Sequence, residues 1–156
     1  MPVVPGPGNA YYMGPMQQAY SQTLFGEEIA FDDNDAEWCA IRVPRSGIIT
    51  GITAQFFCKD GFTIAPGIDA TLYVLVYSAL DPAIVFTPLT DTLTPFTPAL
   101  DVDLPAHSIL RAGNASLNVP ISFGEDLLVT LGIIARAAPD YEYPLMGEAI
   151  VTISID

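Results

Sequence analysis

A short run, TLYVLVY at positions 71–77, decides the fold of this chain. Successive side chains of a strand point to opposite faces, and here both faces receive only large apolar or aromatic groups after Thr71. A strand with one face in water would alternate apolar with polar residues. The run LLVTLGII at 127–134 has the same two-faced character. A sandwich buries one face of each sheet, so we predict that the second face packs against another subunit. The residues that we assign to assembly on these sheet faces are Leu72, Tyr73, Leu75 and Tyr77.

Runs rich in Val, Ile, Thr, Phe and Tyr recur from Leu24 to the end and are bounded by Gly, Pro, Asn and Asp. This pattern predicts an all-β domain over 24–156, a jelly-roll-like sandwich of two sheets with about eight or nine antiparallel strands. The segment Thr90–Ala106, which carries three prolines, is expected to be a long irregular crossing. The predicted strands are Leu24–Phe31, Glu37–Val43, Gly47–Cys58, Asp69–Ala79, Ile84–Pro88, Ser108–Ala112, Ala115–Phe123, Asp126–Ala135 and Gly147–Ile155.

Residues 1–23 differ from the domain, because they are rich in Pro, Gly, Gln and Tyr and carry no charged side chain. Proline and glycine argue against a regular helix or strand over most of this length. The segment is either a disordered tail or an ordered arm that lies across a neighbouring subunit, and we favour the arm. Its anchors would be Tyr11, Tyr12, Met13, Met16 and Tyr20.

The composition favours assembly over several other functions. Hydrophobic residues make up 51% of the chain and charged residues 15%, against roughly 25% charged residues in ordinary soluble domains. The formal net charge is -13, and the five basic residues are scattered, so we predict no nucleic-acid partner. No apolar run approaches the roughly 18 residues of a membrane span, and prolines interrupt the start of the chain, so we expect neither membrane insertion nor a secretory signal.

Four stretches resemble the C-terminal domain of BclB-type exosporium glycoproteins. They are IRVPRSGIITGITAQF (41–56), TLYVLVYSA (71–79), FTPLTDTLTPFTPAL (86–100) and LNVPISFGEDLLVTLGIIA (117–135). The resemblance implies a jelly roll similar to those of the C1q and tumour-necrosis-factor families. It also implies assembly as a trimer, contact with other spore-layer proteins, and a place on the bacterial spore surface after synthesis in the mother-cell cytoplasm. That family usually carries a collagen-like region before this domain, whereas only VPGPGN (4–9) stands here.

Candidate sites for chemistry are few. The acidic run DDNDAE contributes Asp32, Asp33, Asp35 and Glu37, whose oxygens suit calcium, although the spacing is not that of an EF-hand and a solvated turn is the simpler interpretation. The resemblance to C1q-like jelly rolls favours calcium slightly; we expect no other cofactor. Cys39 and Cys58 lie on different predicted strands and are either buried thiols or a disulfide.

We expect no catalytic residues and no enzyme. The one histidine, His107, lies beside Ser108 with no sequence signature of a nucleophile or of a phosphate loop. The leading hypothesis is a structural, self-assembling protein. A carbohydrate- or receptor-binding module is an alternative, with Trp38, Tyr141 and Tyr143 as stacking residues. A fibre subunit joined by strand donation is another, with SQTLFGEEIAF (21–31) as the donor.

Overall fold

The computed structural model describes residues 1–3, 6–7, 9–13, 18–30, 40–63, 67–80, 85–137 and 143–156. Over these residues the chain forms strands and one short 3-10 helix, η1 (Thr90–Thr92), which confirms the all-β prediction. None of these residues belongs to a helix with the length and apolar character that crossing a membrane requires. In chain order the strands are β1 (Pro2–Val3), β2 (Gly6–Pro7), β3 (Asn9–Met13), β4 (Gln18–Leu24), β5 (Ile29–Ala30), β6 (Ile41–Arg42), β7 (Gly47–Cys58), β8 (Asp69–Ala79), β9 (Val85–Pro88), β10 (Thr94–Pro95), β11 (Ile109–Asn114), β12 (Val119–Ile121), β13 (Asp126–Ala137), β14 (Tyr143–Pro144) and β15 (Gly147–Ile155).

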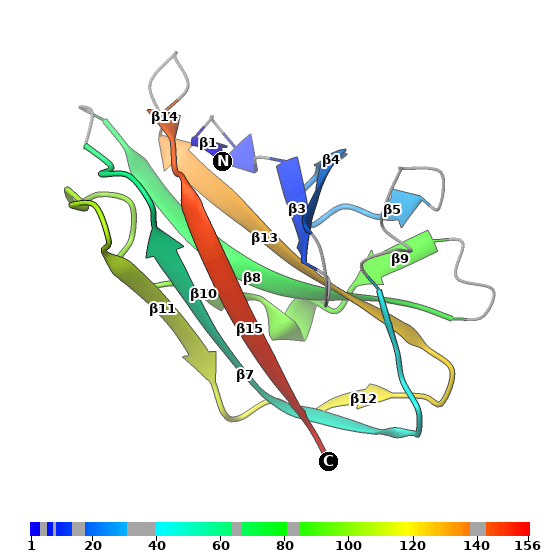
Figure 1. Cartoon of the computed structure of the whole chain (residues 1–156). Coiled ribbons are helices and arrows are strands. Elements are labelled where there is room, and N and C mark those ends of the chain that lie inside the picture. The colour runs from blue at the N-terminus through cyan, green and yellow to red at the C-terminus, as the bar shows by residue number, and fades with distance from the viewer. Residues whose placement is uncertain are drawn as a thin grey trace.

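Two antiparallel sheets form a sandwich, in keeping with the predicted jelly-roll-like architecture (Figure 1). In the large sheet, β8 and β13 pair from Ala79↔Asp126 to Asp69↔Ala137. In the small sheet, β7 is central, with β15 along one edge and β11 and β12 along the other. A further short pair joins β1 to β14. This pair joins the first strand of the chain to the segment just before the last strand, β15.

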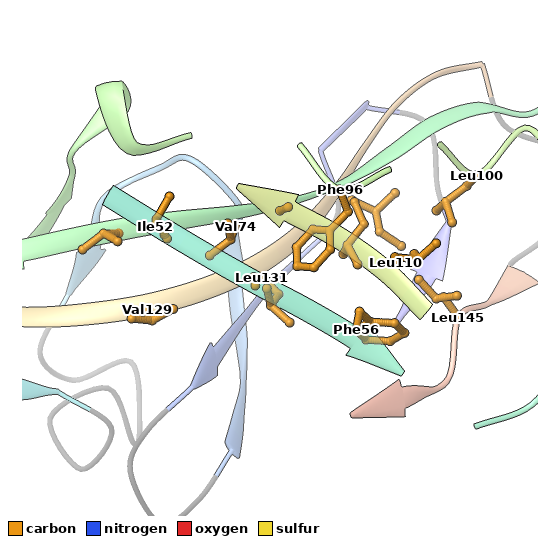
Figure 2. Close-up of a cluster of buried hydrophobic side chains, with 14 of the residues drawn as sticks. Ile52, Phe56, Val74, Phe96, Leu100, Leu110, Val129, Leu131 and Leu145 are labelled. Carbon is orange, nitrogen blue, oxygen red and sulfur yellow. The ribbon is translucent and has the colours of Figure 1, made fainter. Parts of the chain in front are cut away.

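The main core lies between the two sheets. Alternate residues of β7 and β8, such as Ile52, Phe56 and Val74, point into it and are almost fully buried. Figure 2 shows these side chains packed with Phe96, from the segment before β11, and with Leu131 of β13. Each such burial contributes roughly 1.5–3 kcal/mol. The inner apolar face predicted from the TLYVLVY run is thus the core face of β8.

Several strand boundaries follow the sequence pattern closely. The strands Gly47–Cys58, Asp69–Ala79 and Gly147–Ile155 have the predicted bounds. The prediction of one strand over Leu24–Phe31 is wrong, because the chain turns at Gly26, which has a φ of +93°, and the Glu27 N–H donates to the Leu24 carbonyl over 3.1 Å. A glycine adopts this left-handed backbone without steric cost, and that breaks the strand into β4 and β5.

The predicted irregular crossing lies along the free edge of β8. The N–H groups of Leu89, Phe96 and Leu100 donate to β8 carbonyls over 2.8–2.9 Å. Between these points, the buried Thr92 hydroxyl accepts the N–H of Val76 over 2.9 Å and donates to the Leu89 carbonyl over 2.7 Å. The prolines prevent a continuous ladder along β8. The Thr92 hydroxyl therefore accepts the Val76 N–H, for which the crossing offers no backbone acceptor.

Strands β2, β3 and β4 of the N-terminal arm belong to the large sheet, and β1 pairs with β14, which differs from the expectation of little regular structure. Strands β2 and β3 pair with β13, and β4 pairs with β3. The reason is that β3 needs only the proline-free stretch NAYYM to form its ladder. The arm thus extends the large sheet of its own chain beyond β13.

Replacing Thr92 with valine should lower the free energy of unfolding by about 1–3 kcal/mol, because the buried N–H of Val76 loses its acceptor while the side-chain shape is kept. Thr90→Val, at the exposed start of η1, is the matched control and should change stability by less than about 0.5 kcal/mol. Urea unfolding of both variants measures the difference. Equal stability of the two would contradict the role given to the Thr92 hydroxyl.

Candidate functional site

The outer face of the large sheet is buried, although no second sheet covers it. Leu75 and Tyr77 of β8 and Leu128 of β13 are at most 3% exposed on this side. Tyr73 and Ile134 lie beside them and are half-buried. The side chains that complete this second core come from the N-terminal segment and from β9. The buried residues of the outer cluster are Ala10, Phe25, Ile29, Leu75, Tyr77, Ala79, Phe86 and Leu128.

Phe25 is the central contact between the N-terminal segment and the sheet. Its ring lies against the backbone of Gly132 in β13, so a Cβ added at Gly132 would overlap the ring. Phe25 itself is 3% exposed. A glycine inside an apolar strand marks a close approach, and here the approaching group is an aromatic ring rather than a backbone. The sheet therefore carries a notch that is shaped for Phe25.

Tyr77 fixes the turn that follows Phe25. Its hydroxyl oxygen accepts the N–H of Gly26 over 2.7 Å, and the side chain is fully buried. Burial raises the pKa of Tyr77 from about 10 to about 12, a rise to which the nearby Glu27 carboxylate adds and which the Gly26 hydrogen bond opposes. A buried phenol next to the turn ties the segment to the sheet by a polar contact as well as by apolar packing.

The same segment forms backbone pairs with two strands of the large sheet, β13 and β9. Strand β3 pairs with Val129, Thr130 and Leu131 of β13, and β5 pairs with β9 through Ile29↔Phe86. Figure 1 shows β3, β4 and β5 together on the side of β13 and β8 away from β15. Residues 9–13 and 18–30 thus supply both backbone pairing at an edge and side chains that fill the face. We call these residues the plug.

The predicted assembly residues of the sheet divide between the two cores. Leu72 points into the main core, whereas Leu75 and Tyr77 lie under the plug and Tyr73 lies at its margin. In this arrangement the second face is covered by the same chain. Their role in contacts between subunits stays a prediction, and it would require the plug of another copy in place of the chain's own.

The predicted anchors of the arm are placed as follows. Tyr11 is half-buried on β3 and lines a small cavity with Phe56 and Leu145. Tyr12 and Met13 belong to β3, and Tyr20 belongs to β4. Met16 lies outside the described residues. The residues that the sequence analysis missed are Phe25, Ile29 and Gly132, and the signal that could have found them is the lone glycine inside LLVTLGII.

The other predicted sites are described only in part. Asp32, Asp33, Asp35, Glu37, Trp38, Cys39 and Tyr141 lie outside the described residues, and Tyr143 is known only as a backbone pair of Val3. Cys58 is a buried free thiol whose pKa is raised by burial. Because Cys39 lies outside the described residues, the two alternatives for this pair, buried thiols or a disulfide, stay predictions. The described residues contain no cluster of three or more His, Cys, Asp or Glu that could hold a metal ion.

His107 has an unusual backbone but no catalytic surroundings in the described structure. It is exposed with a φ of 70°, and its N–H donates to the Cys58 carbonyl over 2.8 Å. The adjacent Ser108 hydroxyl donates to the Pro105 carbonyl over 2.6 Å rather than to the histidine. These contacts form a tight turn before β11 and supply no activated nucleophile.

The chain matches no family model, no curated protein and no solved structure. Its candidate site therefore has to be argued from its own geometry. The feature that this geometry presents most clearly is the apolar outer face and the plug that covers it.

Gly132→Ala should detach Phe25 from the sheet, because the new Cβ would occupy the position of the ring. We expect amides of residues 18–30 to exchange with deuterium at least tenfold faster, while β7 and β8 keep their protection. Gly113→Ala is the matched control, since its Cβ would meet nothing closer than 4.0 Å. The double variant Phe25→Ala, Gly132→Ala should cost less stability than the sum of the two single changes. Strict additivity would show that the two residues do not share the notch.

The raised pKa of Tyr77 predicts a loss of stability at alkaline pH. Because the folded-state pKa lies above the usual value, the contribution of the neutral phenol is complete below pH 10 and is lost as pH rises towards 12. Tyr77→Phe should be less stable at neutral pH, because the Gly26 N–H loses its acceptor, and should decline less between pH 10 and 12. Urea unfolding across this range tests both parts. An unchanged decline would show that Tyr77 is not the group responsible.

Proposed function

We propose that this protein is a structural, self-assembling building block whose copies join by exchanging the plug. The observation that carries the proposal is the outer face of β8 and β13, an apolar surface that is covered by Ala10, Phe25 and Ile29 of the plug together with Phe86 of β9. A face of this kind must be covered, and an identical plug from a neighbouring copy would cover it with the same contacts.

The plug has the properties of a separable element. It is joined to the domain through residues 31–39, FDDNDAEWC, in which four of the nine side chains are carboxylates. The span from Ala30 to Ala40 can reach roughly 33–36 Å when fully extended, about the width of a domain of this size. This reach allows the plug to occupy the face of its own domain or that of a neighbour.

The balance between these two states depends on concentration. Intrachain and interchain plugs make the same hydrogen bonds and bury the same side chains, so the contact energies cancel. What differs is the effective concentration of the plug near each face, which for short linkers is in the millimolar range. High local density, as in a protein layer, therefore favours exchange.

Plug exchange also specifies which strand would be donated under the strand-donation hypothesis. The ladder that would be donated is β3, which pairs with β13, while Phe25 and Ile29 fill the face. The donor segment predicted from sequence, 21–31, contains the two filling side chains and β5, which pairs with β9, but not β3. Each fully buried filling residue would contribute roughly 1.5–3 kcal/mol to the joint.

The resemblance of residues 40–135 to the spore-surface domains supports a place for this assembly on the surface of a bacterial spore. From the same resemblance we propose three copies as the basic unit. A layer of such units needs no enzyme activity, only stable joints.

Plug exchange is tested by two variants refolded together, Phe25→Cys and Gly132→Cys, each made in a chain whose own Cys39 and Cys58 are replaced by alanine. The Phe25 Cβ lies 2.6 Å from the position that a Cβ of Gly132 would occupy, so a shift of about 1 Å brings the pair to disulfide geometry. At a chain concentration of about 1 mM or higher, where neighbouring copies compete with the effective concentration of a chain's own plug, we expect a disulfide between the two different chains, mapped by peptide mass spectrometry, together with trimers or larger species by light scattering.

The matched control is Leu24→Cys with Gly132→Cys, because Leu24 is a neighbour of Phe25 but is 39% exposed. This pair should form much less of the interchain bond. A bond that forms only when positions 25 and 132 are both cysteine in one chain, with a monomer in solution, would refute exchange and leave the plug an intrachain element.

A further inference from the structure

Strand β15 is a long edge of the small sheet. It pairs with β7 from Gly147↔Cys58 to Ile155↔Ile49, and no described residue pairs with its other side. Figure 1 shows it at the outside of the sandwich, ending at the C-terminus. An unpaired edge of this length is a template for another strand.

The direction of the outward backbone groups follows from two contacts. The Lys59 N–H donates to the Met146 carbonyl over 2.8 Å, and at the far end Ile48 and Asp156 exchange both bonds. The direction of the backbone N–H and C=O groups alternates along a strand. Those of the even-numbered residues of β15 therefore point to β7. The outward N–H and C=O groups therefore belong to the odd-numbered residues, which are Gly147, Ala149, Val151, Ile153 and Ile155.

The usual protections of an edge are missing from β15. It contains no Lys, Arg or Pro, its one charge is Glu148, and its one irregularity lies at the end, between Ser154 and Ile155. The side chains that point towards the core are also incompletely covered. Val151 and Ile153 are half-buried, whereas Ala54 and Ile52, which lie opposite them on β7, are at most 3% exposed.

We propose that β15 is an interface for a second copy of this chain, with the two β15 strands pairing antiparallel about a two-fold axis through Val151. This register is the one that pairs the strand over its whole length, from Gly147 opposite the partner's Ile155 onwards. It joins the two small sheets into one continuous sheet. The half-buried side chains of the two strands then cover one another.

A second copy fits this edge in chemistry as well as in geometry. An edge paired with itself about a two-fold axis offers each donor an acceptor, because the same pattern runs in the opposite direction. In this register Glu148 lies opposite Ser154 of the partner, and Asp156 opposite Met146, so no two carboxylates face each other. On the outer side the exposed Ile150 lies opposite Thr152. A register shifted by two residues would place Glu148 directly opposite Asp156 of the other copy. Repulsion between the two carboxylates disfavours that register.

This interface goes beyond plug exchange and does not depend on it. Exchange joins the outer face of the large sheet to an arm, whereas β15 belongs to the small sheet. A two-fold contact added to units of three copies would pair them into units of six. The two kinds of joint can therefore be removed one at a time.

The first test is Val151→Pro, which removes an outward N–H and leaves the bonds to β7 in place. Val151→Ala is the matched control, because it shortens the same side chain and keeps the N–H. Native mass spectrometry of the full chain should show that the proline variant halves the mass of the assembly, while the alanine variant keeps it. The comparison that blocks plug exchange instead is the chain carrying both Phe25→Cys and Gly132→Cys, oxidised as a monomer, because the disulfide holds the plug on its own domain.

The second test does not depend on how well the proline is tolerated. Ile150 and Thr152 occupy opposite, non-hydrogen-bonded positions in the proposed register, where Cα atoms lie about 4.5 Å apart. The double variant Ile150→Cys, Thr152→Cys should form interchain bonds between position 150 of one copy and position 152 of the other. A pair at Ile150 and Ser154 should not. Absence of the 150–152 bond, or an unchanged mass for Val151→Pro when the disulfide-locked plug variant lowers it, would overturn the β15 interface and leave plug exchange standing.

Discussion

Strands β8 and β13 pair along almost their whole length, and the two apolar faces that this pair presents determine how the rest of the chain is arranged. The inner face requires a second sheet, which β7, β11, β12 and β15 provide. The outer face requires a second cover, which the N-terminal plug provides. An apolar face left in water would cost roughly 25 cal/mol per Å², so neither cover is optional.

The outer cover differs in kind from the inner one. The small sheet is continuous with the domain, whereas the plug is followed by a short acidic stretch. It is held by the packing of Ala10, Phe25 and Ile29, by the buried Tyr77 phenol and by the β3–β13 and β5–β9 ladders. Before the plug, β1 and β2 pair with β14 and β13. Local contacts of this number can open without unfolding the main core. The proposed exchange of the plug between copies rests on this separability.

The edge of β15 differs from the edges of the β8–β13 pair. The large sheet has its β13 edge covered in turn by β6, β3 and β2, and its β8 edge by β9, Thr92 and β10. Arg42 of β6 reinforces that cover through a paired contact with Asp126 of β13 at 3.0 and 3.1 Å. Against this thorough protection, the uncharged and unpaired middle of β15 stands out as a surface for association.

The sequence by itself determined the all-β class, the bounds of strands such as Gly47–Cys58 and Asp69–Ala79, and the fact that β8 is apolar on both faces. These follow from the alternation of side chains along one strand, which is a local property. Only the tertiary structure decided what lies on the outer face. The contact of Phe25 with Gly132 joins residues more than a hundred positions apart, and no local pattern encodes such a pair. The same holds for Thr92, whose place in an apparently irregular segment gave no sign that its hydroxyl would complete the edge of β8.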